Sequence, residues 1–174
     1  MSAERLAKYL TGLALIGGLA VIAAAWGFQL IGGYVPCKLC LEQRVPYYIG
    51  LPLTALALIV MIRARSGVAM LILLVAAAVF AYGAGLGVYQ AGAEWQFWAG
   101  PGDCGGGSGA PAKAADMLQA LQSTRVVSCT EASWRMLGLS FAGWNAVASA
   151  GLAGLALISA LLLKQRRNRV SVGG

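Results

Sequence analysis

The chain contains no histidine among its 174 residues, and only 11% of its residues are charged. Without imidazole the protein cannot ligate haem through histidine, cannot build a zinc site that contains histidine, and lacks an imidazole base. So low a charged fraction, beside 59% hydrophobic residues, is not that of an ordinary soluble domain. The composition therefore indicates a membrane protein, and it leaves four cysteines as the residues that can carry chemistry.

Four apolar runs are long enough to cross a bilayer, whose hydrocarbon core requires about 20 helical residues. They cover residues 10–31, 45–62, 68–90 and 141–163. With their loops they use the whole length, so we expect a single membrane domain over residues 1–174. The sequence thus predicts an all-α integral membrane protein built as a four-helix transmembrane bundle.

Glycine and proline positions inside the runs bear on how the helices pack. The segment Gly83–Gly87 has the glycine spacing of a nucleotide fingerprint. It follows an apolar helical run and not a strand, so we interpret it as a site of close helix packing. Pro52 lies inside the second run and predicts a kink there.

The basic residues are concentrated in three of the five polar segments. Eight of the thirteen precede the first run, join the second to the third, or follow the fourth: Arg5, Lys8, Arg63, Arg65, Lys164, Arg166, Arg167 and Arg169. With one acid, Glu4, these segments carry a net charge of +7, whereas the two remaining loops carry five basic and five acidic residues. By the positive-inside rule both termini and the turn at 63–65 are cytoplasmic. The loops at 32–44 and 91–140 then face the periplasm of a bacterial inner membrane, and nucleic acid is not expected as a partner.

The first of these outer loops is short, and the second has about fifty residues. The second loop contains a glycine-rich run at 105–109, to which we assign no role. In the following segment, 111–122, the apolar residues fall at i, i+3, i+4 and i+7: Ala114, Met117, Leu118 and Leu121. This spacing predicts a short amphipathic helix that lies on the bilayer or packs on the protein. We expect no β-strands.

All four cysteines lie in the outer loops, Cys37 and Cys40 in the first and Cys104 and Cys129 in the second. In an oxidising compartment they allow three disulfide pairings, and two structural disulfides are one interpretation. A Cys-X-X-Cys pair encloses only two residues, however, so it restricts the unfolded chain very little. The same spacing is typical of redox-active pairs. A zinc or iron–sulfur site fits poorly, because 24 residues separate the second pair.

The position of the first pair favours redox chemistry. Cys37 and Cys40 precede the second run, at a helix N-terminus where unpaired N–H groups and the helix dipole favour an anion. If the helix has begun by Cys40, Arg44 lies one turn further along the same face. Arg44 would then stabilise a Cys40 thiolate, unless its side chain simply extends to the lipid headgroups.

If both cysteine pairs are redox-active, they would pass electrons from a soluble partner to an acceptor dissolved in the membrane. The outer pair can reach a soluble partner, the pair at the membrane surface can reach a lipid-soluble acceptor, and thiol–disulfide exchange links the two. The sequence has no haem ligand and no flavin or nucleotide motif. A membrane quinone is an acceptor that needs no such motif, only an apolar crevice near the thiolate.

Two motifs resemble the DsbB family. The block Pro36-Cys-Lys-Leu-Cys-Leu-Glu-Gln-Arg44 is similar to that family's first-loop signature, Cys-X-X-Cys followed four residues later by arginine. The stretch from Cys129 through Trp134 to Leu139, with Trp144 beyond it, resembles the family's lead into its last helix. Four spans and two outer loops with two cysteines each agree with the family as well.

The resemblance implies a quinone-dependent protein-disulfide oxidoreductase of the inner membrane. Such an enzyme reoxidises a soluble, DsbA-like thiol oxidase of the periplasm and passes the electrons to ubiquinone or menaquinone, and so to the respiratory chain. Carried over to this sequence, Cys104 forms the mixed disulfide with the DsbA-like partner, and Cys129 is its pair. Cys37 exchanges with Cys129 during transfer between the loops. Cys40 faces the quinone as a thiolate, and Arg44 stabilises that thiolate and the charge of the reduced quinone.

Two other functions are alternatives to this one. The vitamin K epoxide reductase family also places a redox pair beside a quinone, but there the Cys-X-X-Cys lies on the last helix, whereas here it opens the second. A membrane scaffold with two structural disulfides and no turnover is the alternative from a different class.

Overall fold

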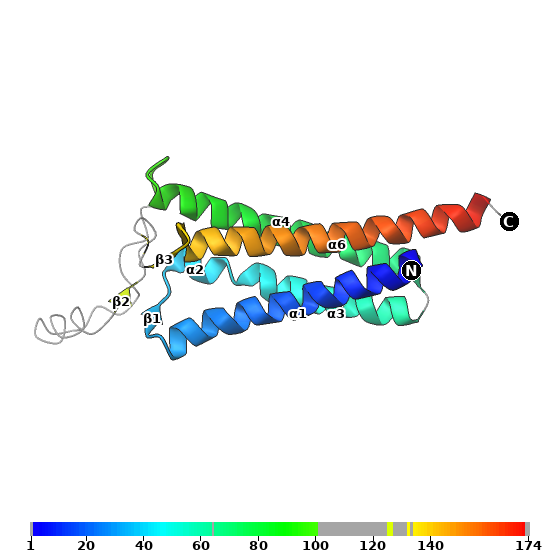
Figure 1. Cartoon of the computed structure of the whole chain (residues 1–174), viewed down its shortest axis with the longest axis horizontal. Coiled ribbons are helices and arrows are strands. Elements are labelled where there is room, and N and C mark those ends of the chain that lie inside the picture. The colour runs from blue at the N-terminus through cyan, green and yellow to red at the C-terminus, as the bar shows by residue number, and fades with distance from the viewer. Residues whose placement is uncertain (1, 64, 101–124, 127–131, 133, 173–174) are drawn as a thin grey trace, which may run out of the picture.

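The computed structural model describes the chain except residues 1, 64, 101–124, 127–131, 133 and 173–174. Within the described residues, four long helices form an elongated bundle with both termini at one end (Figure 1). They are α1 (Ala3–Leu30), α3 (Val45–Ile62), α4 (Ser66–Glu94) and α6 (Phe141–Val172). All four are long and apolar enough to belong to membrane-crossing segments, so the predicted four-helix membrane fold is confirmed.

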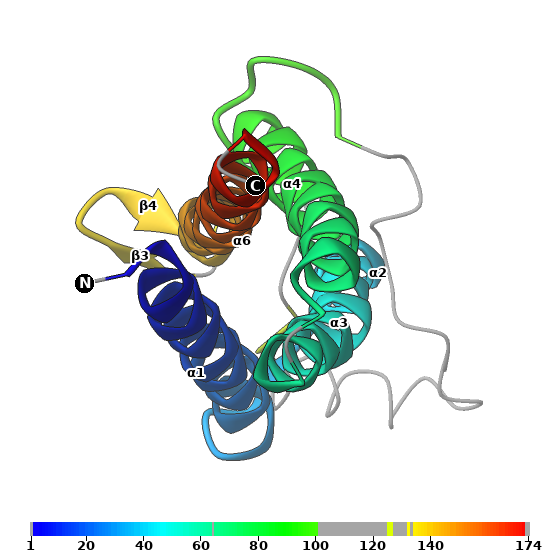
Figure 2. The same cartoon turned by 90° about the vertical axis from the view of Figure 1, so that its right-hand side faces the viewer.

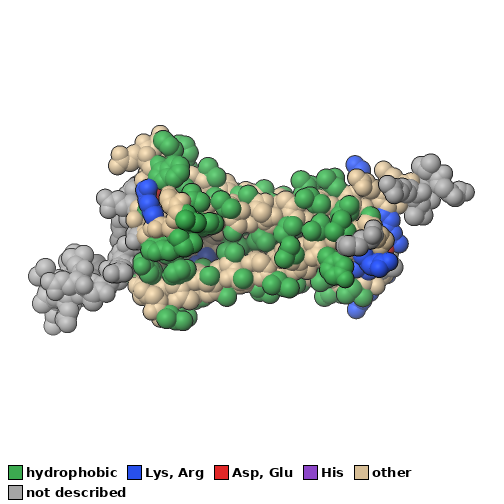
Figure 3. All heavy atoms as spheres, viewed as in Figure 1, with side chains coloured by type: hydrophobic (Ala, Val, Ile, Leu, Met, Phe, Trp, Pro, Cys, Tyr) green, Lys and Arg blue, Asp and Glu red, His purple; other side chains and the backbone are tan. Residues whose placement is uncertain are grey.

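The helices follow one another around the bundle axis, and each packs against two neighbours (Figure 2). Helix α1 contacts α3 and α6, and α4 contacts the same two helices. Large apolar side chains cover the length of the bundle, while basic side chains gather at the end that carries the termini (Figure 3). An apolar exterior of this extent is expected where the solvent is lipid.

The bundle closes tightly because small residues line the contacts between helices. A Cβ atom on Gly87 of α4 would lie 2.8 Å from the backbone nitrogen of Ala146 and 2.9 Å from the carbonyl oxygen of Ala142, both on α6. A Cβ on Gly83 would lie 3.0 Å from Cβ of Pro46 on α3. Gly83 and Gly87 therefore serve helix packing, as their place in an apolar run predicts, whereas a Cβ on Gly85 would have no neighbour within 4 Å.

The termini of the helices follow from local chemistry. The Ser2 side chain accepts a hydrogen bond from the backbone N–H of Arg5 and so caps α1. Pro46 stands in the first turn of α3, where its missing N–H costs no helical hydrogen bond. Helix α3 runs on through Pro52 to Ile62.

The expectation that the chain has no strands is wrong. β1 (Tyr34–Val35) pairs in parallel with β2 (Arg125–Val126), and β3 (Arg135–Met136) pairs antiparallel with β4 (Leu139–Ser140). Each strand has two residues, too few for the alternating pattern by which strands are recognised in a sequence. Between β3 and β4, Leu137 and Gly138 both have positive φ, of 53° and 83°, as in a tight hairpin turn.

Four predicted features lie outside the described residues. They are Cys104, the glycine-rich run at 105–109, the amphipathic helix at 111–122 and Cys129.

Candidate redox site

The first cysteine pair lies on a short helix, α2 (Lys38–Glu42), at the end of the bundle away from the termini (Figure 1). Cys37 is the N-cap residue, and its sulfur accepts a hydrogen bond from the backbone N–H of Cys40 at 3.2 Å. The two Sγ atoms lie 2.7 Å apart, and both cysteines are free thiols. A disulfide requires about 2.05 Å, so the pair needs only a small movement to close or reopen.

The two sulfurs differ in their surroundings. Because Cys37 is hydrogen-bonded to the sulfur of Cys40, and secondly because it is buried, the pKa of the Cys37 thiol is raised above its ordinary value. Cys37 therefore keeps its proton and donates it toward Cys40. Of the two, Cys40 is the sulfur placed to carry negative charge.

A buried glutamine of α4 contacts the pair. Nε2 of Gln90 lies 3.5 Å from Sγ of Cys40 and 4.0 Å from Sγ of Cys37, and the side chain is only 1% exposed. The same nitrogen is 3.4 Å from Oε1 of Glu94, one turn further along α4. Because an amide N–H stabilises a sulfur anion more than a thiol, Gln90 favours the thiolate form of Cys40.

Arg44 lies close to this pair but on a different helix. Helix α2 ends at Glu42, and Arg44 is the N-cap residue of α3. Its guanidinium donates to Oε1 of Gln29 at 2.6 Å and to the carbonyl oxygen of Ala25 at 3.4 Å, both on α1. The continuous helical face on which we expected Cys40 and Arg44 is thus interrupted, and the guanidinium is directed toward α1.

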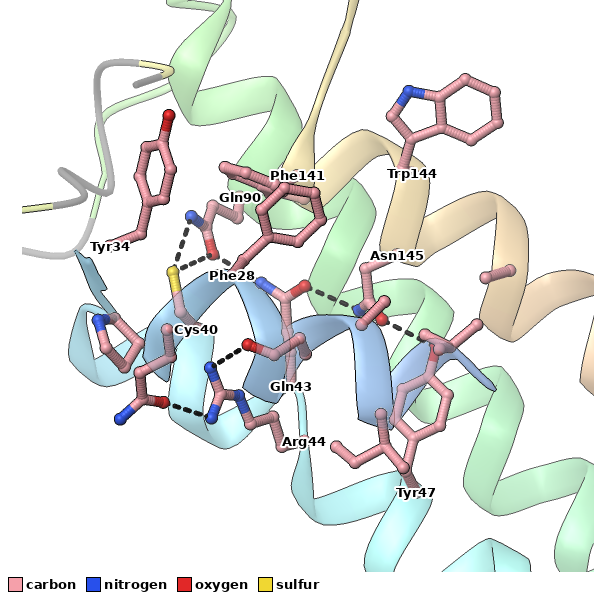
Figure 4. A pocket seen from close by; sticks show the side chains of 18 residues that line it. Phe28, Tyr34, Cys40, Gln43, Arg44, Tyr47, Gln90, Phe141, Trp144 and Asn145 are labelled. Carbon is pink, nitrogen blue, oxygen red and sulfur yellow. Dashed lines mark hydrogen bonds between the residues drawn. The ribbon is translucent and has the colours of Figure 1, made fainter. Parts of the chain in front are cut away.

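Cys40 and Arg44 nevertheless line one cavity of about 310 Å³ (Figure 4). Its wall is mostly apolar and includes five aromatic rings: Phe28, Tyr34, Tyr47, Phe141 and Trp144. Phe28 and Phe141 meet edge to face, with their ring centroids 4.9 Å apart. The polar side of the cavity carries Gln29, Cys40, Gln43, Arg44, Tyr47, Gln90 and Asn145. This combination of an apolar wall and a few convergent polar groups is typical of a small-molecule site.

The structure thus brings Cys37, Cys40 and Arg44 together, and the predicted Cys104 and Cys129 lie outside the described residues. Sequence reasoning did not identify Gln90 or Asn145 as part of the site. The signal that could have found them is a carboxamide at the edge of an apolar run, because such a group must be hydrogen-bonded when it is buried in a membrane protein.

The comparison with protein families decides the classification. A family model described as "Disulfide bond formation protein DsbB" matches residues 7–159 of the chain. The chain belongs to the DsbB family. It is accordingly a disulfide-bond-forming protein of the membrane. Searches of curated proteins and of solved structures give no significant match.

Proposed function

We propose that this DsbB family member is an oxidoreductase that reoxidises a DsbA-like periplasmic thiol oxidase and passes the electrons to membrane ubiquinone or menaquinone. The observation that carries the proposal is the shared cavity of Cys40 and Arg44, in which a cysteine sulfur and a buried cation border one apolar space. The alternative of an inert scaffold is disfavoured, because Cys40 lines this cavity and a Cys37–Cys40 disulfide would enclose only two residues, too few for an effective structural cross-link.

The residues around the cavity fit a quinone head group. About 310 Å³ is at the lower end of ligand-site volumes, so the ring fits and a long isoprenoid tail extends into lipid. The aromatic wall offers faces for a flat ring, and Arg44 offers a donor to a carbonyl oxygen. A bound quinone supplies an acceptor for two electrons and two protons.

The thiol chemistry proceeds by exchange. The dithiol of the partner reduces the Cys104–Cys129 disulfide and is itself oxidised to a disulfide. The Cys104 and Cys129 thiols then reduce the Cys37–Cys40 disulfide, through a mixed disulfide of Cys129 with Cys37 that releases Cys40 as a thiolate. Finally Cys37 and Cys40 give up two electrons and two protons and become a disulfide again.

The pairing of β1 with β2 supports this exchange. Val35 is paired with Val126, and Cys37 follows Val35 by two residues. Cys129 follows Val126 by three residues, which span at most about 11 Å even when fully extended. The strand that precedes Cys37 is thus paired with the strand that precedes Cys129 in the sequence, as exchange between the two cysteine pairs requires.

The charge distribution supports the orientation. The end of the bundle with the termini carries the excess of basic residues, so we place it in the cytoplasm, and the end with α2 in the periplasm of a bacterial inner membrane. Both cysteine-bearing loops then belong to the compartment in which disulfides form.

The test is the oxidation of a reduced DsbA-like protein by the purified full-length chain with a soluble quinone. Loss of partner thiols and reduction of the quinone are followed together. We expect one quinone reduced per partner disulfide, and no turnover in Cys40→Ser. Leu41→Ala is the matched control, because Leu41 lies on the same short helix with its side chain 48% exposed. Turnover that persists in Cys40→Ser contradicts the role of Cys40, and partner oxidation without quinone reduction contradicts the acceptor.

A further inference from the structure

A continuous chain of hydrogen bonds leads from helix α6 to the sulfur of Cys40. Tyr47 on α3 is bonded to Ser149 at 2.9 Å and to Asn145 at 2.8 Å, both on α6. Nδ2 of Asn145 lies 2.7 Å from Oε1 of Gln43, in the turn between α2 and α3. The next bond joins Nε2 of Gln43 to Oε1 of Gln90, whose own nitrogen faces the sulfur (Figure 4).

The donors in this chain all point the same way. The single hydroxyl proton of Tyr47 goes to Oδ1 of Asn145, so Ser149 is the donor in its bond to Tyr47. The oxygen of each amide accepts from the preceding residue, so Asn145 and Gln43 each present an N–H to the next residue. Gln90 ends the series: its Nε2 lies 3.5 Å from the sulfur of Cys40, whereas its Oε1, which accepts from Gln43, is farther from that sulfur, at 3.9 Å.

We propose that this chain, here called the amide relay (Tyr47, Asn145, Gln43 and Gln90), stabilises the Cys40 thiolate. Gln90 makes the contact with the sulfur, and the other three residues are positioning residues that fix the direction of its amide. The inference rests on the proposed function, in which Cys40 delivers electrons as a thiolate.

The surroundings of Cys40 explain why such a device is needed. A thiolate next to an apolar cavity has little water to stabilise it. Among the described residues, the charged and titratable groups near it include Cys37, its hydrogen-bonded neighbour, and Tyr34 and Tyr47, which line the same cavity. Glu94 of α4 acts against a thiolate, and Arg135 of β3 partly offsets Glu94. Arg44 lines the same cavity, but its guanidinium is bonded to α1. The nearest side-chain N–H donor to the Cys40 sulfur among the described residues is thus Gln90.

Burial strengthens the relay. Tyr47 and Gln90 are each 1% exposed and Gln43 is 5% exposed, so water has little access to these three side chains, while Asn145 is half-buried. In such surroundings aligned hydrogen bonds polarise one another, and the N–H at the end of the series becomes a better donor. A merely structural network would hold the helices together without any effect on the reactivity of Cys40.

The experiment measures the alkylation rate of Cys40 by iodoacetamide as a function of pH in the reduced, full-length protein, without quinone and without any partner. Cleavage after Lys38 separates Cys37 from Cys40, so mass spectrometry quantifies each alone. The variants are Gln90→Met, Asn145→Leu and Tyr47→Phe. Ser159→Ala is the control, because Ser159 is a buried hydroxyl of α6 that bonds only to its own helix, at the carbonyl of Leu155.

We expect the pH of half-maximal Cys40 alkylation to rise by about one unit in Gln90→Met, since a hydrogen bond to a charged group contributes roughly that much. Asn145→Leu and Tyr47→Phe shift it in the same direction by a few tenths, and Ser159→Ala leaves it unchanged. An unshifted profile in Gln90→Met overturns the proposal. Shifts in Asn145→Leu and Tyr47→Phe no larger than in Ser159→Ala reject the positioning roles, even if Gln90→Met fails to fold. Because no quinone is present, these outcomes are independent of whether the protein turns over with quinone.

Discussion

The guanidinium of Arg44 lies 5.2 Å from the centre of the Trp26 ring. This cation–π contact adds to the bonds with Gln29 and Ala25, and all three partners belong to α1 and are neutral. Arg44 is only 9% exposed, and it has no salt bridge to a carboxylate among the described residues. A buried cation with neutral partners makes the cavity favourable for a ligand that gains negative charge.

Arg44→Ala should therefore raise the apparent KM for quinone by about tenfold or more, because a hydrogen bond to a charged group is lost. The Cys37–Cys40 pair should still form its disulfide in this variant. Steady-state kinetics with varied soluble quinone measure the effect. Arg63→Ala is the control, since Arg63 is exposed at the opposite end of the bundle. An unchanged KM would show that Arg44 only anchors α3 to α1.

Iodoacetamide should modify Cys40 before Cys37 in the reduced, folded protein. The reagent attacks thiolates, and the pKa of Cys37 is raised by its hydrogen bond to Cys40 and by burial. The Cys37 label should follow the Cys40 label, because modification of Cys40 removes the hydrogen bond that raises the pKa of Cys37. Mass spectrometry of the two peptides gives the order, with denatured protein as the control in which both react alike. Faster labelling of Cys37 would contradict the assignment of the two sulfurs.

Gly87→Ala should destabilise the bundle. The added methyl group meets backbone atoms of α6 at 2.8–2.9 Å, and such overpacking typically costs about 1–3 kcal/mol. Gly85→Ala is a matched control two residues away, because a Cβ there has no neighbour within 4 Å. Thermal unfolding in detergent should show a lower Tm for Gly87→Ala alone. Equal Tm values for both variants would mean that α4 and α6 are not in such close contact.

A thiol probe that cannot cross membranes tests the orientation. In intact spheroplasts it should label reduced Cys104, which we place in the periplasm. In a variant without the four natural cysteines, Arg65→Cys should react only after lysis, because the turn after α3 is placed in the cytoplasm. The opposite pattern would invert the proposed topology.

The four-helix fold could be predicted because the apolar runs and the basic segments each report it directly. The helices are longer than the runs: α1 already begins at Ala3 and α6 continues to Val172. The end turns of these helices contain polar residues, so the apolar runs alone do not mark the helix ends. The cysteine pair and Arg44 could also be found, because their spacing is local.

The side-chain contacts between residues of the site could not be predicted from the sequence. Arg44 bonds to Gln29, and Gln90 faces Cys40 across fifty residues of sequence. Which polar residue meets which depends on the rotation and depth of each helix in the bundle, and a single sequence with apolar residues all around its helices does not reveal that rotation. The break between α2 and α3 was missed for a related reason, since neither Gln43 nor Arg44 is a helix breaker.

The turn between α2 and α3 divides the site residues between two helices of very different length. The sulfurs belong to a five-residue helix, whereas the guanidinium begins an 18-residue helix anchored in the bundle. In the proposed cycle the sulfur–sulfur bond forms and breaks on the short helix, so the helix that begins with Arg44 need not move with it. The acceptor would then meet the same guanidinium in every turnover, and only the sulfur side of the cavity would change.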